Sequence, residues 1–544
     1  MLLRGTTIVS TLTLLSRLLG FGRDLLVAFL LGSSLFADAF FVAFRIPNLL
    51  RSFIAEGALT AAFTPVFASA CAESKNKARL TFRNIAGLLL LITIPIVCAV
   101  IYFASEIVAA FAPGFTDDPT TFALCVQLTQ IMAPYILFVS LIAMINSALN
   151  TLGVFGTSAM AQVVMNLVLI GGGLCALLAT DSQTVTWILA FSVLVGGFAQ
   201  ITSQLPTCRK QGLSIAPLLL GESKARWEVL RLMLPATLGA SIYQITIFFG
   251  TLMASLLPTG SVSWLFYADR IAQFPMGIFS IALASVLLPT LSNAAASSDH
   301  ENFNQNLTNS LRYTSFCIIP VATAIVYFAE PIITLLFERG EFSRYATLQT
   351  ATALQALALG LWASSFHSMI VRAFIARKNT VTPTIIGACT LIITILTALL
   401  LIGPLSTGQG SNWIVTSLAH IQTLLYQSVS ISFSLGHIGL ATASTIAAFF
   451  SMILAVLLFS FSSQSLCWAP VVRATAISIT SSLLTVFGIS RLPLSLLHPF
   501  LQITIGVGLG ICVYGFTSYL LKSREAKELH ALCVSQLKRP RGKL

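Results

Sequence analysis

The sequence predicts an all-α, polytopic membrane protein with about fourteen transmembrane helices. Two observations support this class. Of the 544 residues, 56% are hydrophobic and only 9% are charged, a composition that suits lipid as the surrounding solvent. Apolar runs of about 20 residues, the length that crosses about 30 Å of hydrocarbon, recur from near residue 8 to residue 521.

Polar residues, prolines and glycines divide these runs into successive helices. The predicted spans are 8–31, 36–64, 85–111, 122–149, 157–179, 185–205, 229–256, 262–293, 311–337, 346–371, 381–403, 438–461, 470–490 and 498–521. The first span has a basic residue, Arg4, ahead of its apolar stretch, as a signal sequence has. Charged residues interrupt it and no small-residue cleavage site follows promptly, so we expect a retained helix.

The distribution of basic residues predicts the orientation of the chain. With the N-terminus in the cytoplasm, three of the 30 Lys and Arg residues lie on the opposite side and five are intramembrane arginines. The other 22 fall in cytoplasmic segments or at the cytoplasmic ends of spans. Basic residues favour the cytoplasmic side, so both termini are predicted there. The net charge of +12 and the basic tail 538–543 then indicate contact with lipid headgroups in preference to nucleic acid.

Two spans resemble each other weakly and suggest an internal repeat. Ala37-Asp38 followed by Pro47 in the second span has a counterpart in Ala268-Asp269 followed by Pro275 in the eighth. Six spans separate them, which gives the two halves the same orientation, as in parallel-repeat transporters. The predicted parts are an N-terminal six-helix lobe (1–205), a cytoplasmic loop (206–228), a C-terminal six-helix lobe (229–461), two further helices (462–521) and a basic cytoplasmic tail (522–544).

The connection 404–436 departs from this regular pattern. It is long, and its stretch 414–432 is apolar without being a clear span. An interfacial segment is favoured over a re-entrant segment or an additional span.

Five arginines interrupt the apolar spans or lie at their edges: Arg17, Arg23, Arg45, Arg51 and Arg270. An arginine at the bilayer centre costs about 2.5 to 3.5 kcal/mol even on the lenient insertion scale, so these side chains must face a wet or paired environment inside the protein. Only four acids, Asp24, Asp38, Glu56 and Asp269, accompany them. Arg–Asp pairs that merely join helices explain single cases. The cationic excess instead predicts an anionic, phosphate-bearing cargo, since guanidinium forks match phosphate oxygens.

Enzyme chemistry and resident cofactors are not predicted. The chain has no G-x-x-x-x-G-K-[ST] loop, and no soluble stretch is long enough for an ATPase domain. The ten cysteines are widely spaced without a Cys-x-x-Cys pair, and the six histidines lack metal-ligand spacing, so no metal site is expected.

Several motifs resemble the MurJ (MviN) family of lipid II flippases, members of the multidrug/oligosaccharidyl-lipid/polysaccharide exporter superfamily. They are Ser16-Arg17-x-x-Gly20-x-x-Arg23-Asp24, the run 38–51, Ala55-Glu56-Gly57-Ala58, Ala112-Pro113-Gly114-Phe115 and residues 260–270. The likeness extends from residue 1 to about 400, and more loosely to the end. It implies a V-shaped, fourteen-helix, alternating-access transporter in the bacterial cytoplasmic (inner) membrane. Such a transporter moves an undecaprenyl-pyrophosphate-linked peptidoglycan precursor from the inner to the outer leaflet.

The resemblance also implies roles for individual residues. The family's cavity arginines correspond to Arg17, Arg23, Arg51 and Arg270, and the supporting or gating groups are Ser16, Asp24, Asp38, Arg45, Glu56, Ser263 and Asp269. The last two helices imply a groove for the isoprenoid tail.

This sequence departs from its relatives at two points. Gln273 stands where relatives tend to carry an acid, and spans 229–256 and 381–403 lack the acids of a sodium site. The source of coupling energy therefore stays open.

Two alternatives remain at this stage. A drug or cation antiporter similar to the multidrug and toxic compound extrusion (MATE) transporters predicts a cavity dominated by acids. A non-transporting scaffold that recruits cell-wall synthesis proteins would tolerate loss of the cavity arginines.

Overall fold

A computed structural model of the chain describes residues 2–52, 59–218, 223–405, 412–429, 433–462 and 466–537. Within these ranges the regular structure is entirely helical, which confirms the all-α prediction. In chain order the α-helices are α1 (Leu2–Leu31), α2 (Leu35–Arg51), α3 (Thr60–Glu73), α4 (Lys75–Tyr102), α5 (Ala104–Phe111), α6 (Pro119–Met132), α7 (Tyr135–Thr151), α8 (Gly156–Ala176), α9 (Ser182–Lys210), α10 (Ser223–Ser255), α11 (Ser261–Pro275), α12 (Ile281–Ala296), α13 (His300–Phe337), α14 (Arg344–Ala376), α15 (Val381–Leu401), α16 (Trp413–Val429), α17 (Gly436–Ser462), α18 (Ala469–Ser490), α19 (Pro499–Leu520) and α20 (Arg524–Leu537). Short helical turns are η2 (Pro113–Asp117), the π-helical η3 (Met276–Ser280) and η4 (Leu494–Leu496).

Side-chain caps define several helix starts. Asp118 accepts a hydrogen bond from the Thr120 N–H (3.0 Å), and Asp181 accepts one from the Thr184 N–H (2.7 Å). At α13 the Asn302 N–H donates to Asp299 at 3.0 Å, and this bond lowers the pKa of the Asp299 carboxyl. Each cap satisfies a backbone donor that the first turn leaves without a partner.

The chain forms two compact units. The first comprises Met1–Ser263, Arg339–Ala346 and Pro404–Ser430, and the second comprises Trp264–Glu338, Thr347–Gly403 and Ile431–Leu544. Each unit is described here by itself. The domain boundaries expected from the sequence remain a prediction.

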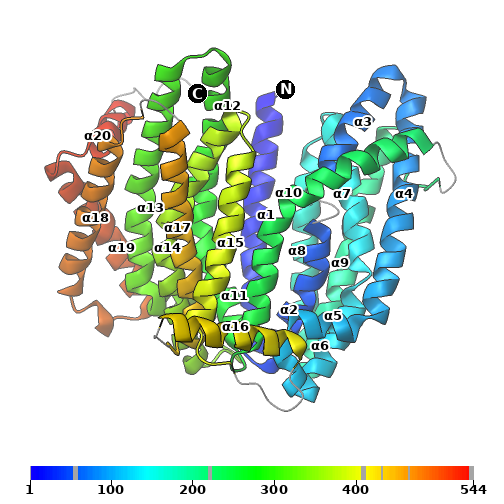
Figure 1. Cartoon of the computed structure of the whole chain (residues 1–544), viewed down its shortest axis with the longest axis horizontal. Helices are drawn as coiled ribbons and strands as arrows, with labels where there is room; N and C mark the ends of the chain where they lie inside the picture. Colours follow the sequence, from blue (N-terminus) through cyan, green and yellow to red (C-terminus); the bar gives the residue numbers. More distant parts are fainter. Residues whose placement is uncertain are drawn as a thin grey trace. The chain divides into compact units, whose positions relative to one another are not determined.

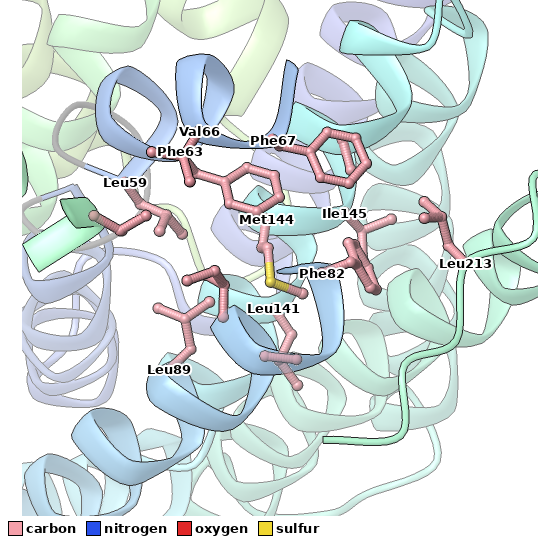
Figure 2. Packing of buried hydrophobic residues seen from close by; sticks show 14 of the residues in the cluster. Leu59, Phe63, Val66, Phe67, Phe82, Leu89, Leu141, Met144, Ile145 and Leu213 are labelled. Atoms are coloured by element: carbon pink, nitrogen blue, oxygen red, sulfur yellow. The ribbon is translucent and has the colours of Figure 1, made fainter. Parts of the chain in front are cut away.

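In the first unit, a buried apolar cluster joins α3, α4 and α7 (Figure 2). The rings of Phe63 and Phe67 stack with centroids 5.1 Å apart, and Phe82 meets Phe67 edge-on at 6.3 Å. The connection before α10 packs against α4 at Gly87, where a Cβ would lie 2.3 Å from the Leu218 carbonyl oxygen. Only glycine permits that approach of the two backbones.

In the second unit, a separate core gathers side chains from α13, α14 and α17. Phe303, Phe374 and Phe459 are fully buried in it. The Arg377 guanidinium lies over the rings of Phe303 and Phe459, with its Cζ atom 4.5 and 4.9 Å from the two centroids. Cation–π contacts of this kind hold the charge against aromatic faces at the edge of an apolar core.

Two segments from the second half of the sequence belong to the first unit. The backbone N–H of Glu341 donates to the carbonyl of Phe29 at 3.0 Å, which fixes residues 339–346 to the last turn of α1. Residues 404–430 include α16, which runs crosswise to α4 and α9 in Figure 1. No local pattern in the sequence indicates that these two segments belong to the first unit.

The length and apolar character of the helices are those of a polytopic membrane protein. Among the described residues, ten segments are long and apolar enough to cross a membrane, or eleven if α11 to α12 forms one bent span. The other predicted spans correspond to α1, to α10, and to α2 with the start of α3. The count of fourteen therefore stays a prediction. The basic tail 538–543 lies outside the described residues.

Candidate functional site

Arg23 and Asp24 form an ion pair in the middle of α1. The Nε and Nη2 atoms of Arg23 donate to Oδ1 of Asp24 at 2.9 and 2.6 Å. The two side chains are only 16% and 5% exposed. Removal from bulk water strengthens such charge-assisted bonds, so the pair fixes the direction of the guanidinium.

A residue that the sequence analysis missed completes this cluster. Asn166 of α8 accepts a hydrogen bond from Nη1 of Arg23 at 3.2 Å and donates from Nδ2 to the Ser16 carbonyl at 2.9 Å and the Ser16 hydroxyl at 3.3 Å. Gly20 faces this amide, and a Cβ there would lie 3.4 Å from Nδ2. Ser16, Arg23, Asp24 and Asn166 are called the α1–α8 cluster below.

Arg17 differs from Arg23 in its surroundings. The helical spacing of Arg17 and Asp24 predicts that they share a face, but Asp24 pairs with its neighbour Arg23. Arg17 is exposed, and no ion pair within the described ranges involves it. Its guanidinium is therefore the most accessible of the predicted ligands in α1.

Asp38 of α2 is buried and accepts three hydrogen bonds. Its carboxylate receives the Gly260 N–H at 2.6 Å, the Ser263 N–H at 2.9 Å and the Ser263 hydroxyl. Gly260 has a φ of +97°, a conformation that favours glycine. An acid at the first turn of α11 also interacts favourably with the helix dipole. Asp38 and Ser263 thus hydrogen-bond to each other within the first unit.

Of the remaining candidates in this part of the chain, Arg45 of α2 contacts α10. Nη1 of Arg45 donates to the Thr251 hydroxyl, and Nε2 of Gln244 donates to the Ser52 hydroxyl at 2.6 Å. Arg51 is half-buried at the end of α2. Glu56 lies outside the described residues.

Asp269 and Arg270 belong to the second unit, on α11. Nε2 of Gln273, one turn later, donates to Oδ2 of Asp269, and the Arg270 Cζ lies 5.1 Å from the centroid of the Phe266 ring. A neutral amide thus faces Asp269 from one turn along the same helix. These contacts orient both groups within one helix.

The predicted site residues thus fall into two groups. The first unit holds Ser16, Arg17, Arg23, Asp24, Asp38, Arg45, Arg51 and Ser263, and the second holds Asp269 and Arg270. In the described part of the chain, no three His, Cys, Asp or Glu residues are grouped as metal ligands.

The family model described as "Lipid II flippase MurJ" matches residues 27–409. The chain belongs to the MurJ family. A probable lipid II flippase MurJ from Rhizobium meliloti (strain 1021) is 37% identical over 406 residues, which cover 72% of this chain and 73% of the relative. The lipid II flippase MurJ of Burkholderia cenocepacia is 35% identical over 398 residues, covering 72% of this chain and 77% of the relative.

Solved structures give the same family and a wider fold relationship. A lipid II flippase MurJ in an inward closed conformation has a TM-score of 0.75 and 25% identity, covering 96% of this chain and 99% of that chain. An inward-facing multidrug resistance MATE transporter has a TM-score of 0.65 at 14% identity, covering 84% and 97%. The MATE likeness concerns the fold alone. Membership of the MurJ family makes this chain a multi-pass membrane protein of the inner membrane.

Proposed function

We propose that this protein is a lipid II flippase, which moves the undecaprenyl-pyrophosphate-linked peptidoglycan precursor from the inner to the outer leaflet. The observation that carries the proposal is the family match over residues 27–409. Its function is transport, so no bond of the substrate is made or broken.

The arrangement around Arg23 supports an anionic cargo. A guanidinium has five N–H donors, and three of them are engaged with Asp24 and Asn166. Two donors remain, on a group whose direction is already fixed. Less rotamer entropy is then lost when a phosphate binds.

We assign substrate binding to Arg17, Arg23, Arg51 and Arg270. In this proposal the exposed Arg17 meets the pyrophosphate first, and Arg23 donates its two remaining N–H groups. Ser16, Asp24, Asp38, Arg45, Glu56, Ser263 and Asp269 are supporting or gating groups. Neutralising two phosphate charges with several guanidinium groups inside a membrane offsets the cost of moving the headgroup out of water.

The lipid tail is proposed to lie along α18 and α19. Both helices expose large apolar side chains, among them Leu483 and Phe487 of α18 and Ile511 and Phe516 of α19. Both also pack against α13 in the second unit. An isoprenoid chain bound there would stay in an apolar environment during transport. Both termini are proposed to be cytoplasmic.

Complementation of a flippase-depletion strain tests this function. We expect Arg17→Ala, Arg23→Ala and Arg270→Ala each to lose rescue of growth. Arg473→Ala, which removes an exposed arginine at the start of α18, should retain it. Rescue by all three cavity variants would favour a scaffold, and drug resistance without rescue of the cell wall would favour an antiporter.

A binding measurement tests the assigned ligand chemistry directly. Purified protein should bind lipid II more tightly than a dephosphorylated analogue, and Arg23→Ala should reduce that preference. Equal affinity for the two lipids would contradict the pyrophosphate assignment, even if the protein complements.

A further inference from the structure

The helix α16 is too short to be counted among the membrane-spanning segments, yet it is rich in apolar residues. It covers Trp413–Val429, seventeen residues, and contains no Asp, Glu, Lys or Arg. It follows α15 in the sequence but belongs to the first unit. The MurJ family match ends at residue 409, before α16 begins.

One side of α16 faces protein. Val415 and Gln422 are buried, and at about 100° per residue they lie within about 20° of each other around the helix. Oε1 of Gln422 accepts the Leu405 N–H at 2.8 Å. At the start of the helix, Nδ2 of Asn412 donates to the Ala109 carbonyl of α5 at 3.0 Å, and α16 packs on η2.

The exposed side of α16 divides into an apolar and a polar edge. Trp413, Ile421 and Leu424 are 76%, 43% and 51% exposed and fall within about 80° around the helix. The hydroxyls of Ser417 and Ser428, also in this sector, donate at 2.8 Å to carbonyls four residues earlier and so need no water.

The polar edge lies beside the apolar edge, between it and the side that faces protein. Its exposed side chains are those of Thr416, His420, Thr423 and Gln427, which fall within about 60° around the helix. The two threonine hydroxyls also donate to carbonyls four residues earlier, so His420 and Gln427 are the groups that require water here. The helix thus presents three separate sectors, to protein, to an apolar phase and to water. A helix at a boundary between two solvents needs such a division, whereas a water-suspended helix does not need an apolar exposed edge.

The neighbouring residues place α16 at the edge of the hydrocarbon. Tyr102 and Phe103, an exposed edge-to-face pair, lie between α4 and α5, and Asp117 and Asp118 are exposed at the end of η2. Exposed aromatic residues mark the membrane–water interface, and charged residues mark the aqueous side. The α5 and η2 anchors of α16 lie in the chain between these two markers.

We propose that α16 lies along the bilayer surface, with Trp413, Ile421 and Leu424 inserted among the acyl chains and its polar edge in water. The occupant of the apolar edge is lipid, continuous with the lipid around α4. In the proposed topology this is the outer leaflet. Because α16 carries no formal charge, its insertion depends on apolar area and not on anionic headgroups.

Spin labels on the full-length protein in phosphatidylcholine vesicles test the proposal. Single cysteines at Ile421→Cys and Leu424→Cys report the apolar edge, and Thr423→Cys and Gln427→Cys are the matched controls, in a background without the native cysteines. The readout is the ratio of collision rates with oxygen, which concentrates in hydrocarbon, and with a water-soluble nickel chelate. We expect this ratio to be higher at both positions of the apolar edge than at both controls, because oxygen concentrates in hydrocarbon and the charged or polar chelate stays in water.

Three outcomes would overturn the proposal. Equal ratios at all four positions would mean that the helix has no lipid-facing edge. Low collision rates with both reagents at Ile421 and Leu424 would mean that protein, such as a second copy of the chain, covers them. A difference that appears only after anionic lipid is added to the vesicles would mean an electrostatic attachment. Labelled variants are compared only if they unfold at the temperature of the unlabelled protein.

Discussion

Asp38 is predicted to be a structural acid, because its carboxylate accepts three hydrogen bonds in a buried setting. Asp38→Ala leaves the Gly260 and Ser263 donors without this acceptor. We expect the free energy of unfolding to fall by about 2 to 4 kcal/mol, since each buried unsatisfied polar group costs about 1 to 3 kcal/mol. The measurement is the unfolding equilibrium of the purified protein in detergent.

Thr129→Val is the matched control for this loss. Thr129 is also buried, but its hydroxyl donates only to the Cys125 carbonyl of its own helix, at 2.8 Å. Its replacement should cost less than about 1 kcal/mol, because the carbonyl keeps its helical partner. Equal losses for the two variants would show that Asp38 has no special structural role.

Asn166 is predicted to position Arg23 for binding. Asn166→Leu removes the acceptor for Nη1 and the donor to Ser16 while it keeps the side-chain volume. A hydrogen bond to a charged group contributes about 1.5 to 3 kcal/mol, so we expect lipid II affinity to fall by about tenfold or more. Binding to the purified protein measures the change.

Gln200→Leu provides the comparison for Asn166. Gln200 is a buried amide on α9 that donates to the Ala161 carbonyl of α8 at 3.0 Å, and it is not among the hydrogen-bond partners of Arg23 in the described part of the chain. Its loss also removes a bond between two helices of the first unit. If both variants weaken lipid II binding equally, helix packing and not the orientation of Arg23 explains the effect.

The sequence predicted the charged residues of the site better than their partners. Charges in apolar runs are conspicuous, and the motif around residue 263 identified Ser263, the partner of Asp38. Asn166 was missed because a single amide in an apolar span has no spacing signature. The one available signal was that a polar amide stands in an otherwise apolar run, between Met165 and Leu167, and therefore needs a hydrogen-bond partner inside the protein. The Arg23–Asp24 pair depends on side-chain rotamers, which helical periodicity does not specify.

At the scale of elements, the helix α20 is joined to α13 by a buried ion pair. Arg312 Nη2 lies 2.5 Å from Glu525 Oε1, and both side chains are buried. Nearby, the Tyr313 phenol donates to Glu528 and lowers the pKa of that carboxyl. We expect Glu525→Leu to cost about 3 to 5 kcal/mol, because it leaves the Arg312 charge buried without its counter-charge. Release of α20, measured by limited proteolysis, should accompany the loss.

The double variant Arg312→Met with Glu525→Leu separates charge pairing from packing. Replacement of a buried ion pair by apolar residues is often neutral or stabilising, so the double variant should recover most of the lost stability. A double variant as unstable as Glu525→Leu would show that the Glu525 side chain is needed for its hydrogen bonds and not for its charge. The hydrogen bond in question is the one that the Ser523 hydroxyl donates to Oε2 of Glu525 at 2.7 Å.

Helix positions were largely predictable from hydrophobic runs, but helix length and continuity were not. The predicted span 311–337 forms the second part of α13, which begins eleven residues earlier at His300, directly after the Asp299 cap. The span 36–64 covers α2 and the start of α3, and its residues 53–58 lie outside the described ranges. Caps and polar helical extensions leave no trace in hydropathy, which explains these differences.

At the scale of the whole molecule, the basic residues predict which loops face the cytoplasm. We expect Thr180→Cys, between α8 and α9, to react with a membrane-impermeant thiol reagent in intact cells, in a background without the native cysteines. Lys210→Cys, at the end of α9, should react only after the membrane is permeabilised. Both positions are exposed, so orientation alone should decide their labelling.

The reverse labelling pattern would place the N-terminus outside. Labelling of both positions in intact cells would mean that α9 does not span the membrane in a fixed orientation. Neither result would alter the family assignment, which rests on residues 27–409.

The exchange of residues 339–346 and 404–430 into the first unit has a consequence for biogenesis. Most of this unit is synthesised by residue 263, but the segment 339–346 that meets Phe29 and the helix anchored to Ala109 emerge from the ribosome much later. The N-terminal helices must therefore be inserted in the membrane before their unit is complete, and the carbonyls of Phe29 and Ala109 stay without these partners until then. A chaperone or insertase that shields membrane proteins during synthesis would have its longest task at these two places.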